Sequence, residues 1–342
     1  MRKFIITLVL FLAIVFVILS ISELKNIVAT LQHSNYRFLV AAVFVELIWL
    51  FNSATDYSSL YRVVGLKEKN YHLVLVATAA NFINVIAPSV GIGGMAVFLD
   101  DASKRHHSTG KVTVVGVMYI LFDYLAFFCV LAMAFVVLIR RNNLNIGELT
   151  ASAILLAIAA GVAFLLYLGY KSAARLGSAL ARIARLINRI VRPFIHREYL
   201  DEEKAHFYAK EIAEAIHSLR GRRKELLWPF LFALNNFALL ICVLAFTFLA
   251  LGTPFTVGTL VGGFAIGYLF LIVSPTPSGL GIVEGTMTLA LNTLRVEWAA
   301  ASLITLTYRL ITFWLPLAIG AVAFRLLGGR STSLPPIPPP AT

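Results

Sequence analysis

Long apolar stretches, separated by short polar loops, constrain this chain more than any other feature of its sequence. Each of six stretches has the length needed to cross about 30 Å of hydrocarbon as a helix. They are residues 4–21, 38–55, 112–139, 149–170, 226–251 and 299–327. The chain is 59% apolar and only 13% charged, against about 45–50% and about 25% in soluble domains. A soluble fold is therefore excluded, and we expect an all-α polytopic membrane protein.

Two further apolar regions, residues 71–99 and 256–294, carry proline and glycine near their middle. Such residues interrupt a helix, and non-helical backbone within a bilayer persists only inside protein or beside a wet cavity. We therefore predict two broken, re-entrant hairpins, which with the six spans give eight transmembrane segments by the usual count.

The distribution of basic residues predicts the orientation. The chain carries 29 Lys and Arg against 17 Asp and Glu. If both hairpins return to the side they enter from, only Lys25, Arg37, Arg140, Arg141 and Arg295 lie in outer loops. The positive-inside rule then places both termini in the cytoplasm, with the first hairpin entering from the cytoplasm and the second from outside. We expect a plasma or inner membrane protein that does not bind nucleic acid.

The order of segments suggests an inverted repeat. Residues 1–170 form an N-terminal membrane half with the hairpin 71–99, and residues 226–330 form a C-terminal half with the hairpin 256–294. The stretch around Pro88 resembles the stretch around Pro275, and Tyr119 has a counterpart in Tyr308. In transporters built from such repeats, the paired interruptions indicate the substrate site. Chance similarity between two interrupted segments is the alternative.

Between the halves, residues 171–225 form a basic, amphipathic cytoplasmic insert. Leu176, Leu180 and Ile183 recur at helical spacing and arginines occupy another face, which predicts an interfacial helix that ends at Pro193. A second, more acidic helix should pack on the cytoplasmic surface. The insert is either a connector that fixes topology or a lipid-sensing element. The proline-rich tail, residues 331–342, is expected to be disordered.

Polar residues inside the apolar segments are the candidates for function, because they are costly in hydrocarbon. Asp123, Glu284 and Arg309 can form an ion pair or a proton site, and the guanidinium of Arg309 also suits a phosphate. A structural salt bridge from Arg309 to Glu284 or Asp123 is the alternative.

Asn81 and Asn84 share a helix face, and they serve either as interhelical hydrogen bonds or as substrate contacts. Further buried polar positions are Glu46, Asn52, Asn235 and Asn236.

Motifs of catalysis are missing from the sequence. It holds neither a P-loop nor a spaced set of His and Cys ligands. His106 and His107 are expected to be solvated, and Asp100 and Asp101 to cap a helix or face solvent. We therefore expect no catalytic residue, no metal and no cofactor, and a protein that is not an enzyme.

Three motifs resemble those of the lysylphosphatidylglycerol synthase transmembrane-region family, also called flippase-like or UPF0104. The segment Pro275 to Glu284 resembles P-x-P-G-G-L-G-x-x-E, with Ser278 in place of the usual glycine. Asn81 to Gly94 and Tyr308 to Pro316 resemble two further family patterns. The 342 residues hold no counterpart of the cytosolic aminoacyl-transferase domain of some members, so synthase activity is not expected. The resemblance implies movement of a phospholipid or polyprenyl-type glycolipid between leaflets.

Taken together, these features predict a lipid flippase or scramblase that binds a headgroup, expected to be anionic, between the hairpins. The candidate substrate-binding residues are Asn81, Asn84, Pro88, Gly93, Gly94, Pro275, Pro277, Gly279, Gly281, Glu284 and Arg309. The alternative is a non-transporting membrane partner of a lipid- or glycan-modifying enzyme, with the insert and the tail as docking surfaces.

Overall fold

The computed structural model describes residues 34–86, 92–141, 144–195, 202–219, 221–274 and 276–328, and these residues contain helices and no strands. The long helices are α2 (Tyr36–Val63), α5 (Thr109–Arg140), α6 (Ile146–Lys171), α7 (Ala173–Ile195) and α9 (Leu227–Ala250). The shorter ones are α3 (Asn70–Ile86), α4 (Ile92–Lys104), α8 (Glu202–His217), α10 (Val257–Val273), α11 (Ile282–Thr293), α12 (Trp298–Arg309) and α13 (Leu315–Leu326).

Five helical segments of the described chain are long and apolar enough to cross a membrane. They are α2, α5, α6, the segment that ends with α9, and the continuous segment from α12 to α13. Each overlaps one of the apolar runs predicted from the sequence along most of that run. The remaining predicted run, residues 4–21, and the tail 331–342 lie outside the described residues.

The last span is continuous but irregular. A π-helical turn, Leu310–Trp314, joins α12 to α13 directly after Arg309. Pro316 lies in the first turn of α13. Proline has no N–H to bond with an earlier carbonyl, and π-turns are often found where a helix is locally disturbed at a functional site.

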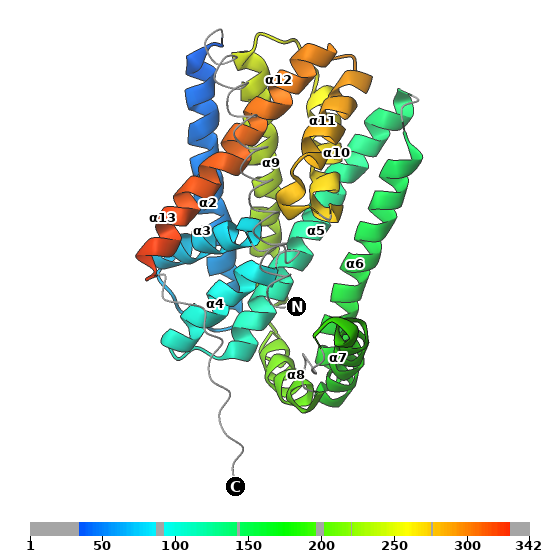
Figure 1. The fold of residues 1–342 in the computed structure, drawn as a ribbon. Helices are drawn as coiled ribbons and strands as arrows, with labels where there is room; N and C mark the ends of the chain where they lie inside the picture. The colour runs from blue at the N-terminus through cyan, green and yellow to red at the C-terminus, as the bar shows by residue number, and fades with distance from the viewer. Residues whose placement is uncertain are drawn as a thin grey trace.

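The two broken regions form helical hairpins in opposite halves of the molecule. In the first, α3 packs on α4, and in the second, α10 packs on α11 across the short 3-10 turn η2 (Pro277–Gly279). The first hairpin shares an apolar core with α8 and α13, whereas the second belongs to a separate core with α6 and α12. Figure 1 shows α3 and α4 in the lower part of the bundle and α10 and α11 in the upper part.

The two halves exchange packing partners in a reciprocal way. The spans that directly precede the two hairpins, α2 and α9, pack along each other, while α3 packs on α13 and α10 packs on α5. Each half therefore supplies the wall on which the other half's hairpin lies. At the α2–α9 contact, Asn52 donates to Asn236 Oδ1 at 2.7 Å and accepts from Asn235 Nδ2 at 2.9 Å.

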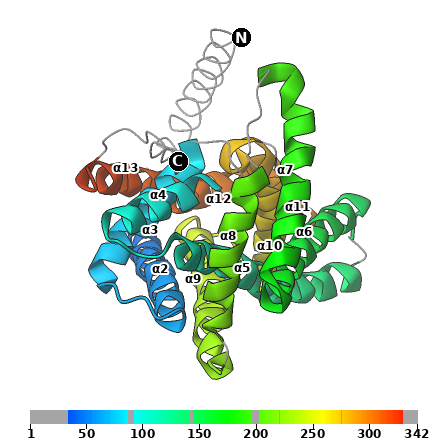
Figure 2. The ribbon, with the colours of Figure 1, turned by 90° about the horizontal axis from the view of Figure 1, so that it is seen from below.

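The insert folds into α7 and α8, which pack on each other at one end of the bundle. Figure 2 shows both helices at nearly full length, whereas Figure 1 shows α7 end-on, so α7 lies across the direction of the spans. Helix α8 packs on α5 and α6, as a surface helix was predicted to do. The prediction that Pro193 ends the first helix is wrong, because α7 continues to Ile195. The last turn of a helix tolerates the single hydrogen bond that proline removes.

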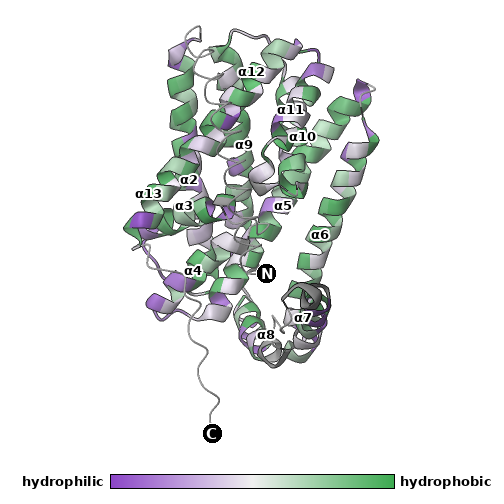
Figure 3. Cartoon of the chain, viewed as in Figure 1, coloured by the Kyte–Doolittle hydropathy of each residue, from purple (hydrophilic) through white to green (hydrophobic). Residues whose placement is uncertain are grey.

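Apolar residues dominate the outer faces of the spans, as Figure 3 shows, and polar residues gather at the loops and on the insert. Exposed apolar side chains such as Phe44, Leu156 and Phe164 project from α2 and α6. Such a surface is typical of a protein whose solvent is lipid.

The close crossing of α13 and α3 depends on Gly320. A Cβ atom at this position would lie 2.7 Å from the carbonyl oxygen of Thr78 and 2.8 Å from Cβ of Phe82. We expect Gly320→Ala to lower the free energy of unfolding by about 1–3 kcal/mol, because a rigid backbone must move. Thermal unfolding in detergent measures this loss. Gly161→Ala is the matched control, since nothing lies within 4 Å of its Cβ position. Equal melting temperatures for the two variants would contradict the prediction.

Candidate functional site

A cavity of about 450 Å³ lies between the hairpins and is lined by residues of both halves. The first hairpin contributes Asn81, Asn84 and Gly94, and the second contributes Ser274, Thr276 and Ser278. Asp123, Tyr308 and Arg309 line it from the spans. Asn81, Asn84, Asp123 and Arg309 were singled out in the sequence, where they lie far apart. The fold brings all four to the wall of this cavity.

The first hairpin is closed near its tip by Asn84. Its side-chain oxygen accepts a hydrogen bond from the backbone N–H of Gly94 at 2.5 Å. A Cβ atom at Gly94 would lie 2.6 Å from Nδ2 of Asn84, so this approach suits glycine. Asn84 thus makes a hydrogen bond between α3 and α4 and also lines the cavity, while its predicted contact with substrate stays a prediction. Asn81 lines the cavity one turn earlier, and Gly93 lies beside Gly94 in the first turn of α4.

The tip of the second hairpin is built from left-handed backbone. Ser278, Gly279 and Gly281 have φ angles of 49°, 70° and 78°. This region is costly for residues with a Cβ atom and open to glycine. The preference for glycine at the Ser278 position of the motif thus has a structural reason. Thr276 adds support, because its hydroxyl donates to the carbonyl oxygen of Leu280 at 3.1 Å.

Arg309 and Glu284 form a buried ion pair beside this tip. Nε of Arg309 donates to Oε1 of Glu284 at 2.6 Å, and Nη2 donates to the carbonyl oxygen of Ser278 at 2.9 Å. The other carboxylate oxygen of Glu284 accepts the backbone N–H of Gly281 at 2.6 Å. The guanidinium also lies 4.6 Å from the ring centre of Phe313. Of the partners predicted for Arg309, the structure selects Glu284 and not Asp123.

Asp123 lies in another part of the cavity, among aromatic side chains. The hydroxyl of Tyr268 lies 3.4 Å from Oδ2 of Asp123. Nearby, Tyr57 and Tyr119 are stacked with ring centres 4.0 Å apart, and the Tyr119 hydroxyl lies 3.0 Å from Oγ of Ser53. The cavity is thus lined by Arg309 of the ion pair at the second hairpin and by an acidic, tyrosine-lined region around α5, whereas Glu284 is not among its lining residues.

The sequence analysis missed one acidic and one aromatic residue in this region of α2. Asp56 is buried on α2, and Tyr57 beside it lines the cavity. The predicted span ended at residue 55, whereas α2 continues to Val63. A carboxyl group directly after an apolar run was the signal in the sequence that could have indicated this position.

Some predicted positions cannot be placed in the cavity. Pro88 and Pro275 lie outside the described residues, and Pro277 is described only as the first residue of η2. Gly279 and Gly281 shape the turn and are not among the residues that line the cavity.

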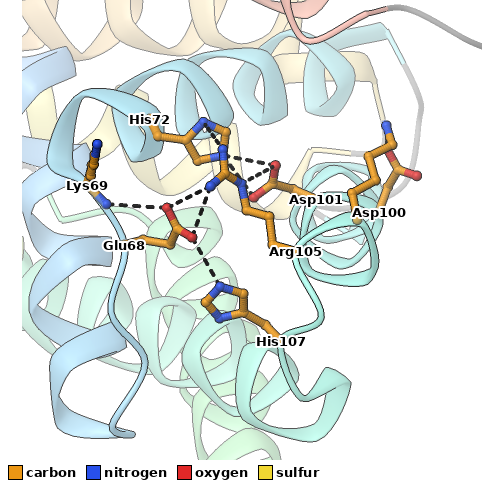
Figure 4. A network of polar contacts seen from close by, with 8 residues as sticks. Glu68, Lys69, His72, Asp100, Asp101, Arg105 and His107 are labelled. Carbon is orange, nitrogen blue, oxygen red and sulfur yellow. Dashed lines mark hydrogen bonds and ion pairs between the residues drawn. The ribbon is translucent and has the colours of Figure 1, made fainter.

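A network of charged groups joins the loop before α3, both helices of the first hairpin and the loop after α4 (Figure 4). Oε1 of Glu68 lies 3.2 Å from Nη1 of Arg105 and 3.1 Å from Nε2 of His107. Nε2 of His72 lies 2.9 Å from Oδ1 of Asp101, and its Nδ1 lies 3.0 Å from Nη2 of Arg105. Because arginine can only donate, Nδ1 of His72 accepts and Nε2 carries the proton.

This network corrects two predictions. His107 and Asp101 were expected to be solvated or capping groups, but both are largely buried and bonded within the network. Their sequence neighbours behave as predicted: His106 is exposed, and Asp100 forms an exposed pair with Lys104. Their partners, His72 and Glu68, belong to other segments of the chain. They become neighbours only when the loop after α4 folds against α3.

The network should make stability depend on pH through Glu68. Partial burial acts to raise the pKa of Glu68, but the charge of Arg105 and the hydrogen bond from His107 outweigh it and hold that pKa below its ordinary value of 4.5. A lowered carboxyl pKa stabilises the folded state above the ordinary pKa, and this contribution is lost as the pH falls through the lowered value.

We therefore expect Glu68→Gln to cost about 1–3 kcal/mol at neutral pH and progressively less below pH 4.5. Thermal unfolding across this range measures the difference from the wild type. Asp100→Asn is the control, since its pair with Lys104 is exposed and should contribute little. A loss that stays constant into acid would show that Glu68 does not act through its charge.

The described spans, the hairpins that turn back within the bundle, and the buried ion pair at the cavity define a polytopic integral membrane protein. More particularly, the chain belongs to the family of the lysylphosphatidylglycerol synthase TM region, which it matches over residues 4–320. It is similar to a UPF0104 membrane protein of Pyrococcus horikoshii, with 24% identity over 94% of this chain and 96% of the relative. A UPF0104 membrane protein of Methanothermobacter thermautotrophicus is also 24% identical, over 93% and 92%.

The ion pair at the cavity gives a test by double-mutant cycle. We expect Arg309→Ala or Glu284→Ala alone to cost about 3–5 kcal/mol, because each leaves an unpaired buried charge. The double variant should lose clearly less than the sum, since it leaves neither charge behind. Unfolding in detergent provides the three values, and Arg37→Ala on the exposed start of α2 is the control. Strict additivity would mean that the two side chains do not interact.

Proposed function

We propose that this protein moves the polar headgroup of a membrane lipid across the bilayer while the acyl chains remain in the surrounding lipid. The observation that carries the proposal is the cavity at which the two opposed hairpins meet. In membrane transporters, broken helices of repeated halves surround the substrate site near the midplane. The apolar outer faces of the spans suit lipid chains that slide along the protein.

The chemistry of the second hairpin supports a phosphate-bearing headgroup. Nη1 of Arg309 has no hydrogen-bond partner among the described residues, while Nε binds Glu284 and Nη2 binds the carbonyl oxygen of Ser278. Helix α11 begins at Ile282, and its N-terminal turn adds partial positive charge near the same place. An anionic oxygen in the cavity would therefore meet a donor without breaking the ion pair.

Translocation is tested in proteoliposomes that contain phosphatidylglycerol or a polyprenyl phosphate labelled on its tail with a dithionite-sensitive fluorophore. We expect wild-type protein to expose the inner-leaflet label to dithionite faster than protein-free vesicles. Arg309→Lys should slow this at least about tenfold, because an ammonium keeps the charge but not the planar donor set. Arg37→Ala should leave the rate unchanged.

A rate equal to protein-free vesicles for both lipids, in folded wild-type protein, would overturn the proposal. An Arg309→Lys variant as fast as wild type would remove Arg309 from the site.

The second candidate function, a membrane partner of a lipid- or glycan-modifying enzyme, is favoured by one feature. Helix α8 exposes Phe207 and Tyr208, with 63% and 47% of their surface accessible, and exposed aromatic side chains suit a docking surface.

A further inference from the structure

Glu46 is a fully buried carboxyl group inside a membrane-spanning helix. It lies within α2, one turn before Leu50, on a helix that crosses the membrane. Its exposed fraction is 0%, and neither carboxyl oxygen has a hydrogen-bond partner among the described residues. A buried ionisable group in a span without a partner marks a functional position by default.

The residue one turn along α2 from Glu46 is also buried and lacks a partner. Trp49 follows Glu46 on this helix, and its Nε1 has no hydrogen-bond partner among the described residues. Tyr308 of α12 lies close enough to interact with the charge of Glu46. Both Trp49 and Tyr308 also line the cavity. Glu46 is thus adjacent to residues of the cavity wall but is not itself among the lining residues.

The charged groups of the neighbouring helices do not neutralise Glu46. From α12, the guanidinium of Arg309 is directed to Glu284 by Nε and to Ser278 by Nη2. From α9, the polar groups are Asn235 and Asn236, which bond to Asn52. From α5, Asp123 lies near Asp56, farther along α2, and carries the same sign of charge. No cation among the described residues is paired with the Glu46 carboxyl.

An ionised carboxylate in this place would lose its hydration and gain no partner, which costs far more than holding a proton. The carboxyl group of Glu46 is therefore neutral in this conformation. Deprotonation becomes favourable only when water or a polar group from the cavity reaches it. Trp49 and Tyr308 line the cavity, and side chains rotate far faster than helices rearrange.

We propose that Glu46 is a proton-binding site that exchanges its proton with the cavity past Trp49 and Tyr308. The step is the simple equilibrium between a carboxylate plus a proton and a carboxylic acid, and no other bond changes. Because the protonated form suits the closed, dry environment and the ionised form needs a wet one, proton binding is linked to the state of the cavity. Its coupling to lipid movement rests on the proposed function, whereas the proton site itself does not.

Infrared spectroscopy of the protein in liposomes tests the site directly. The difference spectrum between wild type and Glu46→Gln should contain the carbonyl stretch of a protonated carboxylic acid at neutral pH. Transfer into D2O should shift this band, because an exchangeable proton is replaced by deuterium. Asp56→Asn is the matched control, since it removes a different buried carboxyl of the same helix and should leave the Glu46 band in place.

Two results would overturn the proposal. A difference spectrum without the acid band would show that Glu46 is ionised, and a band that never shifts in D2O would show a sealed, structural proton. If Glu46→Gln fails to fold, wild-type protein with isotopically labelled glutamate carboxyls gives the same information, because the label displaces the band of a protonated glutamate but not that of an aspartate.

A second measurement separates this proposal from the proposed function. With a pH gradient across the vesicles, lipid translocation by wild type should change in rate, and translocation by Glu46→Gln should not respond. A gradient response retained by Glu46→Gln would overturn the coupling role. Absence of translocation in all variants, together with an exchangeable acid band, would refute the transport function and leave the proton site standing.

Discussion

The fold depends on one constraint, which is that backbone N–H and C=O groups inside a bilayer must find partners within the protein. An uninterrupted helix meets this requirement by itself, but the interrupted stretches between α3 and α4 and between α10 and α11 do not. Each therefore needs an interior place. The reciprocal packing of α3 on α13 and of α10 on α5 provides it. The cavity lies between the two hairpins and is lined by described residues of both.

Within that frame, the Arg309–Glu284 pair connects three otherwise separate features. It ties the start of α11 to the last span, it satisfies the carbonyl of Ser278 in a left-handed turn, and it lies just before the π-turn Leu310–Trp314. A buried pair of this kind is a modest source of stability, because desolvation offsets much of the attraction. Its stronger effect is on geometry, since it fixes the position of a guanidinium beside the cavity.

The sequence predicted the spans well, because apolar length is a local property that a single chain displays. It also indicated both hairpins, since proline and glycine cannot continue a helix. What it left open was pairing: whether Arg309 meets Glu284 or Asp123 depends on how α11 and α12 pack. The burial of His107 and Asp101 was mispredicted for the same reason, as their partners Glu68 and His72 belong to other segments. Asp56 was missed because a charge is an ambiguous signal, typical both of the end of a span and of a site within it.

The exchange of partners between the halves has a consequence for how the protein is made. The wall on which α3 rests is α13, and α13 leaves the ribosome only after every other described helix. Until residue 326 has been synthesised, the first hairpin lacks the surface that shields its polar backbone. The N-terminal half thus reaches the membrane as an incomplete unit, and its assembly is finished only when the C-terminal half inserts beside it.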